Sequence, residues 1–379
     1  MTEKTAQLGA KETRFEIVRD AQRLAEIGPA WGALWTQSGA LVFQHHGWVS
    51  AWWNHTPDQG KRRLMIVLAW RGDALEAVLP LATCKRRGVR LLEWAAKDYA
   101  DYCDAIVLPG ASRATLPGMW SYVSAAGGFD VVHLNRLLPD AAARTLIGAA
   151  AGGVALGPNH RVEHSLRVSG AWPSGEAWFE ELSKKPRQNY RRGIKVMSED
   201  ADLQFRLLPP GQPLEPVLHR LGTLKRRWLA EHGFEAPLFD EGSPMLTAFV
   251  AVLAQTGQLR AFVLERKGEI VAISVNFVQG KTMMAFLTTY DPAVERGSPG
   301  MVLMVDYIKW SFDHGLTCID FLCGAEDFKN RFATTTTTLE SFAGSRGMQG
   351  LAMLMADKAR QWLKSRQSPP AAVGVPDYA

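Results

Sequence analysis

The sequence has few cysteines and lacks the paired cysteines and histidines that bind metals. The two absences argue against a disulfide-rich protein and against a zinc site. Its 379 residues include only four cysteines, none in a Cys-x-x-Cys pair: Cys84, Cys103, Cys318 and Cys323. Scattered cysteines of this kind indicate reduced, mostly buried thiols rather than a disulfide framework. No Cys/His spacing typical of zinc is present, so we expect no metal.

Long apolar runs are also missing. No stretch reaches the roughly 20 apolar residues that a membrane-spanning helix requires, and residues 1–14 lack the apolar core of a signal peptide. We therefore expect a cytoplasmic protein whose membrane contact, if any, is peripheral. The net charge of +5 weakly favours anionic partners and does not by itself indicate nucleic-acid binding.

The remaining composition is that of an ordinary globular protein long enough for two domains. Hydrophobic residues make up 47% of the chain and charged residues 21%. A break rich in small residues at 169–175 separates two halves that each mix strand and helix patterns. We predict domains at residues 14–168 and 175–345. We also predict a disordered tail at residues 366–379, which are small and Pro-rich.

The first half opens with a strand-like alternation at residues 14–18, followed by a helix that Asp20 can cap. Residues 63–70 and 74–83 form an expected hairpin. Small residues at 141–153 predict a helix. Together these patterns favour the α/β class, with a mixed α+β sheet.

Residues 261–332 carry the clearest signal. Three strand patterns lead to a turn at residues 296–300, an apolar helix and a polar strand end. With its Ser-Pro-Gly turn and its Asp-Phe…Gly…Glu…Lys block, this order resembles the GNAT acyltransferase superfamily, and within it the FemAB/CelD-like branch. The Phe-Gln…Trp…Trp-Trp element and the Asp-Tyr…Asp block of the first half resemble the same branch. The resemblance covers roughly residues 14–345 and implies tandem GNAT-like folds.

A Gly-rich turn that begins a helix leaves backbone N–H groups free for an anion. The resemblance implies that acyl-CoA, such as acetyl-CoA, is the co-substrate and that its phosphates meet this turn. The expected acyl-CoA residues are Asn276, Arg296, Ser298, Gly300 and Met301. A plain helix cap would produce the same local pattern.

The catalytic candidates are acidic, aromatic and basic side chains in otherwise apolar blocks. Asp101 and Asp104 stand among tyrosines, where a carboxylate can have a raised pKa and act as a base. Aspartate is also frequent in turns, which is the alternative reading. The resemblance adds Tyr290 and Lys329 to these candidates, although Lys329 could instead form an ion pair with Glu326.

A basic cluster opens the second half. Arg187 and Arg191 are four residues apart, so a helix would place them on one face. Either a bound anion or solvent would screen their repulsion. The candidate substrate-binding residues are Tyr102, Arg187, Arg191, Asp320 and Glu326.

The sequence therefore favours an N-acyltransferase acting on an amine of a small molecule, a sugar or a lipid-linked envelope or polysaccharide precursor. One alternative is a Fem-type transferase that uses aminoacyl-tRNA, which is the only nucleic-acid partner we consider. No long helical arm of the kind often found in such enzymes is evident. Another alternative is a non-catalytic GNAT-fold component of exopolysaccharide biosynthesis. The sequence predicts no oligomeric state.

Overall fold

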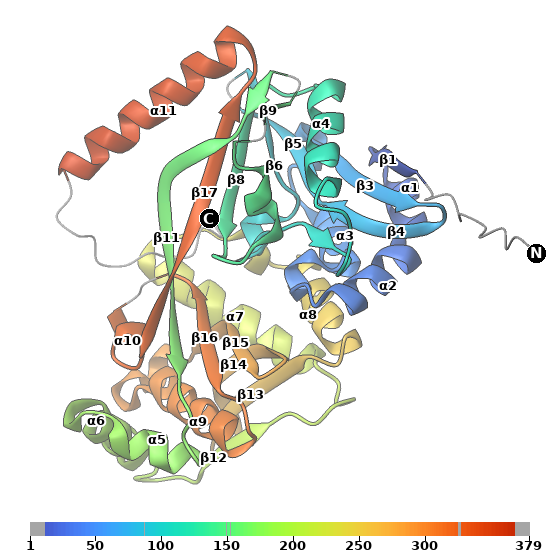
Figure 1. The fold of residues 1–379 in the computed structure, drawn as a ribbon. Helices are drawn as coiled ribbons and strands as arrows, with labels where there is room; N and C mark the ends of the chain where they lie inside the picture. Colours follow the sequence, from blue (N-terminus) through green and yellow to red (C-terminus); the bar gives the residue numbers. More distant parts are fainter. Residues whose placement is uncertain (1–11, 87, 149, 152, 325–326, 368–379) are drawn as a thin grey trace, which may run out of the picture.

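The computed structural model describes residues 12–367, except residues 87, 149, 152, 325 and 326. Within this part of the chain, a mixed sheet of 11 strands runs through both halves of the molecule (Figure 1). Its strands, in spatial order, are β12 (Leu203–Leu207), β13 (Leu259–Arg266), β14 (Glu269–Gln279), β15 (Thr282–Tyr290), β16 (Cys318–Cys323), β11 (Gly157–Ser169), β17 (Thr335–Ser345), β8 (Val131–Leu137), β6 (Val89–Trp94), β5 (Leu81–Arg86) and β2 (Arg62–Leu64).

Two smaller sheets belong to the first half. One contains β1 (Thr13–Val18), β3 (Ile66–Arg71), β4 (Ala74–Leu79) and β7 (Ile106–Val107), and the other pairs β9 (Ala150–Ala151) with β10 (Val154–Ala155). The α-helices are α1 (Ala21–Glu26), α2 (Gly28–Ser38), α3 (His46–His55), α4 (Thr115–Ala126), α5 (Gly175–Glu181), α6 (Lys184–Met197), α7 (Glu215–His232), α8 (Met245–Gln255), α9 (Pro299–Asp313), α10 (Asp327–Asn330) and α11 (Gly347–Gln367). The 3₁₀ turns are η1 (Val42–Gln44), η2 (Gln59–Lys61), η3 (Lys97–Tyr99), η4 (Ala142–Leu146), η5 (Pro237–Phe239) and η6 (Pro292–Gly297).

The two halves repeat one topology. In the first half β6 and β8 run parallel and α4 lies between them in the chain. In the second half β15 and β16 run parallel and α9 lies between them. Other pairs in the large sheet are antiparallel, so each half contains one place where a helix crossover joins parallel neighbours.

The halves also exchange a strand. The C-terminal strand β17 pairs with β8 of the first half, while β11, which precedes the second half, pairs with β16. β11 and β17 pair with each other at the centre of the sheet (Figure 1). Each half is therefore completed by a strand from the other, and the expected mixed sheet with a repeated fold is confirmed.

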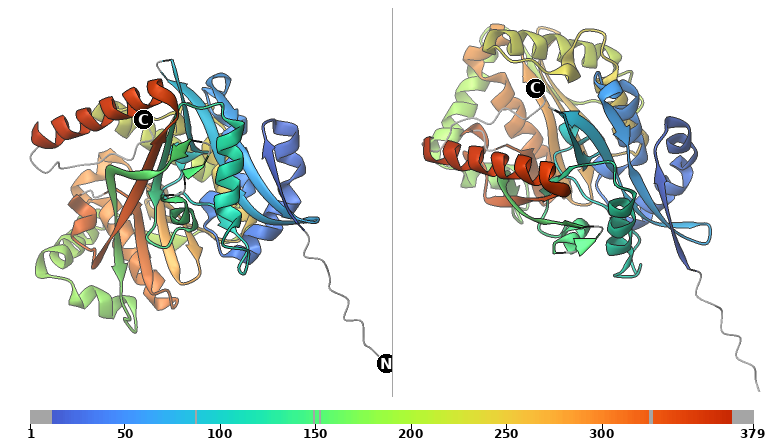
Figure 2. Two further views of the ribbon diagram at one scale, coloured as in Figure 1. Left: turned by 45° about the horizontal axis from the view of Figure 1, so that its top comes forward. Right: turned by 90° about the horizontal axis from the view of Figure 1, so that it is seen from above.

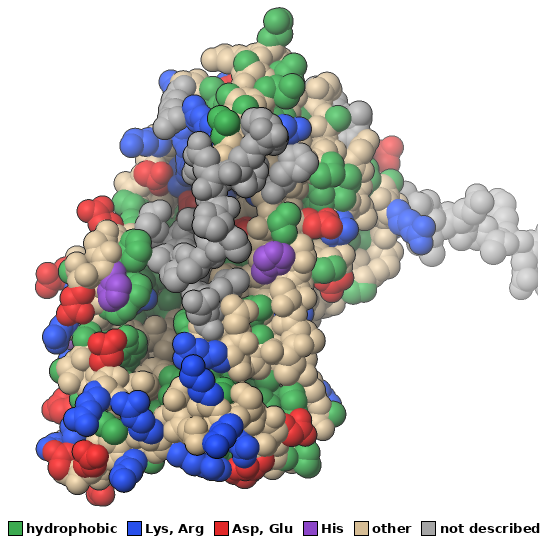
Figure 3. Space-filling model, turned by 90° about the vertical axis from the view of Figure 1, so that its left-hand side faces the viewer, with side chains coloured by type: hydrophobic (Ala, Val, Ile, Leu, Met, Phe, Trp, Pro, Cys, Tyr) green, Lys and Arg blue, Asp and Glu red, His purple; other side chains and the backbone are tan. Residues whose placement is uncertain are grey.

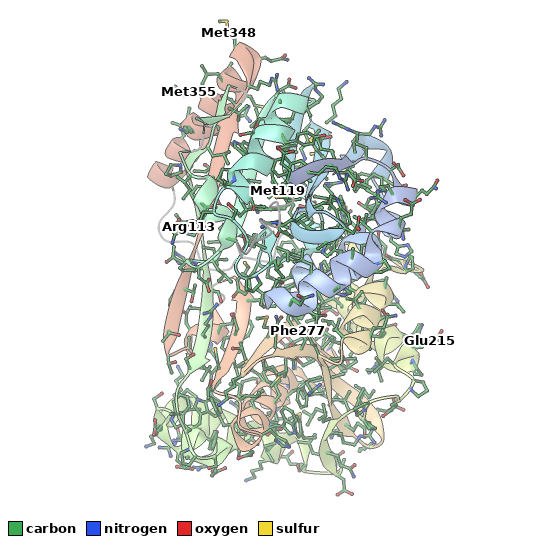
Figure 4. All side chains as sticks on the ribbon, turned by 45° about the vertical axis from the view of Figure 1, so that its right-hand side comes forward. Arg113, Met119, Glu215, Phe277, Met348 and Met355 are labelled. Carbon is green, nitrogen blue, oxygen red and sulfur yellow. The ribbon has the colours of Figure 1, made fainter. Side chains whose placement is uncertain are left out.

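An aromatic core joins the halves. Phe43 of η1 packs edge-to-face on Phe277 of β14, with ring centroids 5.6 Å apart. Trp48 of α3 stacks on Phe249 of α8 at 4.3 Å. Aromatic pairs of this kind add about 0.5–1.5 kcal/mol beyond the area they bury. Phe277 lies at the waist of the molecule, where the two halves meet (Figure 4).

Some local predictions were wrong. The small-residue segment at 141–153 is not a helix: it forms η4 and then the β9–β10 pair. Gly148 and Gly153 adopt positive φ angles of 73° and 78°, which interrupt helical backbone. The helix expected after Asp20 is divided into α1 and α2 at Ile27.

Helix α11 was not predicted from the sequence. This 21-residue helix follows β17 and extends outward from the end of that strand (Figure 2). Residues 366–367, assigned to the tail, are the end of α11, and residues 368–379 lie outside the described residues. The two-domain division stays a prediction, with residues 170–174 linking β11 to α5. In the described part of the chain, no helix is both long and apolar enough to span a membrane.

Candidate active site

A buried hydrogen-bond network surrounds Asp320. This residue occupies the last pair of the short parallel ladder between β15 and β16, opposite Met284. Its carboxylate oxygens lie 2.7 and 2.8 Å from the Tyr102 hydroxyl. Ser165 of β11 donates its hydroxyl to the same carboxylate at 2.7 Å. The network therefore joins a loop of the first half, the exchanged strand β11 and strand β16.

Two further donors complete the surroundings of Asp320. Arg167 donates through Nε at 2.9 Å, and the Leu322 N–H donates at 2.8 Å. Leu322 has a positive φ of 59°, a conformation that costs a non-glycine residue about 1–3 kcal/mol. This turn directs its N–H back to the carboxylate. Because the side chain of Asp320 is only 1% exposed, these donors replace the water that it loses on folding.

The tyrosine in this network is a proton donor. Burial, with a further contribution from the charge of Asp320, raises the pKa of Tyr102 well above its ordinary value. Its hydroxyl therefore stays protonated at neutral pH. A tyrosine in this state holds the carboxylate in place and cannot act as a general base.

Asp101 and Lys329 both contact the backbone of Cys323, at the end of β16. The Cys323 N–H donates to Asp101 Oδ1 at 3.2 Å, and Lys329 Nζ donates to the Cys323 carbonyl at 3.3 Å. Both side chains are buried, with 3% of Asp101 and 8% of Lys329 exposed. Burial also raises the pKa of the Cys323 thiol well above its usual range, so this thiol is not a thiolate nucleophile at neutral pH.

Arg136 holds the loop that carries Asp101 and Tyr102. It is buried at the end of β8, where its guanidinium donates to the carbonyls of Ala100 at 3.2 Å and Lys97 at 3.3 Å. Its Nε also donates to Glu163 of β11 at 3.1 Å. The loop is thus fastened to both β8 and the exchanged strand.

Asp104 has a different environment from Asp101. Its carboxylate accepts backbone N–H bonds from Ala105 at 2.7 Å and from Ala142 and Ala143 at 2.8 Å each. Burial raises its pKa to about 6, although the three N–H bonds oppose that shift. Both carboxylate oxygens accept hydrogen bonds from backbone N–H groups at the start of η4, an arrangement that stabilises the conformation of the loop. A catalytic role for Asp104 stays a prediction.

The start of α9 has the backbone arrangement expected at an anion site. Ser298 adopts a left-handed conformation with φ of 49°, and its side chain does not cap the helix. The first helical bond runs from the Val302 N–H to the Ser298 carbonyl, which leaves the N–H groups of Gly300 and Met301 at the open helix end. The first turn contains no acidic residue, and Arg296 is exposed just before it.

Tyr290 lies against this helix start. A β-carbon placed on Gly300 would come within 3.0 Å of the Tyr290 ring, so the ring and the glycine are in close contact. Burial, with Glu295 adding to it, raises the pKa of Tyr290, whose hydroxyl therefore remains protonated at neutral pH.

Asn276 is fully buried on β14, where its Oδ1 accepts from Ser274, and Nδ2 has no partner among the described residues.

The basic helix α6 packs beside the same turn. Gly193 of α6 approaches Gly297 so closely that an added β-carbon would lie 2.6 Å from the Gly297 carbonyl oxygen. Arg187 and Arg191 both pair with Glu180 of α5, and the Arg191 contact is 2.7 Å. Glu180 thus relieves part of the expected repulsion. Figure 3 shows Lys and Arg gathered with acidic side chains at the end of the molecule where α5 and α6 lie.

The structure therefore divides the predicted residues into groups. It brings Asp101, Tyr102, Asp320 and Lys329 together at the junction of the halves. The second group, at the α9 turn, contains Tyr290, Ser298, Gly300 and Met301, with α6 alongside. Glu326 lies outside the described residues.

Sequence reasoning missed the residues supplied by β11. Glu163, Ser165 and Arg167 alternate along this strand, and all three take part in the network described above. Their spacing of two places them on one face of a strand. Three polar side chains at this spacing, alternating with the apolar Leu166 and Val168, were the signal that could have found them.

Each half contains a helix crossover between two parallel strands of the large sheet. Residues 184–330 match the family model described as the acetyltransferase (GNAT) domain. This part of the chain is therefore a GNAT-type domain. No curated protein sequence matches the chain significantly.

Two solved structures share the fold over most of the chain. One is the C-terminal DUF2156 domain of a putative lysylphosphatidylglycerol synthetase from Agrobacterium fabrum, with 15% identity and a TM-score of 0.53. The alignment covers 88% of this chain and 96% of that one. The other is FemX, with 9% identity and a TM-score of 0.56, covering 87% of this chain and 96% of that one.

Proposed function

We propose that this protein is an N-acyltransferase that moves an acyl group from acyl-CoA to a primary amine. The main support for this proposal is the turn at the start of α9, which lies inside the matched GNAT domain. Gly300 and Met301 present backbone N–H groups there, at a helix start without a side-chain cap. These groups and the dipole of the 15-residue helix suit a phosphate. Acyl-CoA supplies an acyl thioester that an amine can attack directly.

The neighbouring residues support roles in this reaction. Arg296 and helix α6 would add positive charge near the phosphates. Tyr290, whose ring contacts Gly300 and whose hydroxyl is protonated, would donate a hydrogen bond to a phosphate bound at this turn. Asp101 would accept a proton from the amine at the junction of the halves, and Lys329 would orient the amine substrate. Asp320 and Tyr102 position this loop through their hydrogen bonds.

The acceptor would be an amine on a small molecule, a sugar or a lipid-linked envelope or polysaccharide precursor, as in the CelD-like branch. The junction between the halves is the proposed acceptor site, because Tyr102, Ser165 and Asp320 meet there from three segments. We place the reaction in the cytoplasm, where acyl-CoA is available.

A Fem-type transfer from aminoacyl-tRNA is a second candidate. The shared fold with FemX over 87% of this chain favours it, as does the basic helix α6 beside the α9 turn. A non-catalytic role in exopolysaccharide biosynthesis would need neither donor.

Donor binding separates these functions. We expect acetyl-CoA to raise the melting temperature of the full chain and to bind saturably in calorimetry. Release of free CoA thiol with a panel of amines, including glucosamine, would then measure turnover. Binding of charged tRNA without acetyl-CoA binding would favour the Fem-type reaction, and binding of neither donor would contradict both enzymatic functions.

A further inference from the structure

A cavity of about 300 Å³ lies in the first half, between the face of the large sheet and helix α11. Pockets that hold small molecules span roughly 300–1,000 Å³, whereas one water needs only about 10–15 Å³. The cavity is therefore large enough for a ligand of several heavy atoms. It is separate from the residues at the α9 turn and from the Asp320 network, none of which lines it.

Four polar side chains from three adjacent strands line this cavity. Each has a buried atom without a hydrogen-bond partner in the described part of the chain: His133 Nε2, Asn135 Oδ1, Asn159 Oδ1 and Ser341 Oγ. Asn159 and Ser341 are only 7% and 3% exposed, and they face each other directly across the β11–β17 pair. A buried polar atom left unpaired costs about 1–3 kcal/mol. Four such atoms around one cavity are available to hydrogen-bond a ligand that enters it.

The polar lining is uncharged at its centre. The two carboxamides and the serine hydroxyl are neutral, and burial lowers the pKa of His133 to about 4, so its ring is neutral at neutral pH. Three cations line the cavity. Arg161 pairs with Asp357 of α11 at 3.2 Å, and Lys97 contacts Glu93 at 3.7 Å as well as Asp98, whereas Arg86 is exposed. An anion would find few free charges here.

Apolar side chains line another part of the cavity. Leu91 of β6, Val131 of β8 and Met353 of α11 pack together there and line the cavity. A pyranose ring presents an apolar C–H face and a rim of hydroxyl groups that both donate and accept hydrogen bonds. This matches a cavity with one apolar wall and several neutral donors and acceptors.

The position of His133 relates this cavity to the duplicated fold. In the first half the parallel ladder pairs Leu91, Leu92 and Glu93 with β8, and His133 is opposite Glu93 in the third pair. In the second half Asp320 holds the third pair of the β15–β16 ladder. His133 is thus the topological counterpart of Asp320, and the cavity opens at the same point of the repeated fold.

We propose that this cavity is a sugar-binding site, which takes one uncharged pyranose unit between the sheet and α11. Ser341, Asn159, Asn135 and His133 hydrogen-bond its hydroxyl groups, while Leu91, Val131 and Met353 contact its apolar face. The Arg161–Asp357 pair holds α11 as one wall of the site. Sugar binding here is independent of acyl transfer in the second half, and each can be measured without the other.

The test is binding of glucose and of N-acetylglucosamine to the full chain, measured by calorimetry and by saturation-transfer NMR. We expect saturable binding of at least one sugar. Ser341→Ala and Asn159→Ala should each weaken it about fivefold or more, since each removes a neutral hydrogen bond. Asn135→Ala provides a third variant if either of these fails to fold.

Ser124→Ala is the matched control. Ser124 is also a buried serine whose hydroxyl has no partner among the described residues, but it lies on α4 and does not line the cavity. It should bind sugar like the wild type. The absence of saturable binding for both sugars would mean that the cavity holds only water and would overturn the proposal. Equal affinity in all variants, or binding of inorganic phosphate that displaces the sugar, would overturn it too.

Discussion

The hydroxyl of Tyr102 lies 2.7 Å from one oxygen of Asp320 and 2.8 Å from the other, although 218 residues separate them in the chain. This contact joins a loop of the first half to the last strand before α10. It depends on β11, because Ser165 lies within 2.7 Å of both side chains. The junction of the halves is therefore held by a buried polar network as well as by aromatic packing.

Replacing Tyr102 by phenylalanine should destabilise the protein by about 1–3 kcal/mol, because Asp320 then keeps its burial but loses a donor. Urea unfolding would measure the loss. Tyr307→Phe is the matched control, since Tyr307 is equally buried and its hydroxyl has no partner among the described residues. A double-mutant cycle with Asp320→Asn should show coupling between the two side chains. Equal losses for both tyrosines would argue against the network.

Replacing Gly300 by aspartate should abolish acetyl-CoA binding. The new carboxylate would occupy the N–H groups at the helix start and repel the phosphates. Its β-carbon would also press on the Tyr290 ring at 3.0 Å, so a small loss of stability is expected. Gly300→Ala carries the same β-carbon without the charge, and should keep measurable binding. Calorimetry would measure the affinity of each variant for acetyl-CoA. If Gly300→Asp binds as tightly as the wild type, the turn does not bind the phosphates and only begins the helix.

Lys329→Met and Asp101→Asn should each lower turnover by about 100-fold or more, a much larger effect than their lowering of the melting temperature. Both substitutions keep the shape of a buried side chain, and Asn retains the oxygen that accepts from Cys323. Lys309→Met is the control, because Lys309 on α9 pairs with Glu176 far from this loop in the chain. If the variants unfold readily but the folded fraction keeps full specific activity, the two residues are structural.

The wild type should lose stability as the pH falls from about 6.5 to about 4. Burial lowers the pKa of His133 to about 4, and the charges of Arg161, Lys97 and Arg86 reinforce the shift while Asp357 opposes it. In this window the unfolded chain binds a proton that the folded chain excludes, so acid favours unfolding.

His133→Asn should flatten this part of the stability profile. The readout is the slope of unfolding free energy against pH between about pH 7 and pH 5, rather than the absolute stability of either protein. Some slope will remain, because burial also lowers the pKa of His45 to about 4. Identical slopes in wild type and variant would show that His133 accepts a proton freely in the folded state.

Much of the second half could be read from the sequence. Alternating apolar residues predicted β13, β14 and β15, and Pro299 with Gly300 marked the start of α9. These signals are local: side-chain periodicity and turn chemistry act within a few residues. The same reasoning grouped Ser298, Gly300 and Met301, which are adjacent in the chain.

The sequence could not reveal contacts that depend on the exchange of β11 and β17. Strand patterns do not name their partners, so nothing local places Ser165 beside Tyr102 or Asp320. The small residues at 141–153 had helical propensity, but positive φ at Gly148 and Gly153 and pairing of β9 with β10 prevailed. Helix α11 and the cavity beneath it likewise required the folded sheet.

The sequence by itself determined the elements of the GNAT-type half and the residue types at its turn, because these follow from local periodicity and backbone preference. Only the tertiary structure decided that Asp101 faces the Cys323 backbone while Asp104 holds η4. Two aspartates three residues apart have the same local propensities, and long-range packing alone gives them different surroundings.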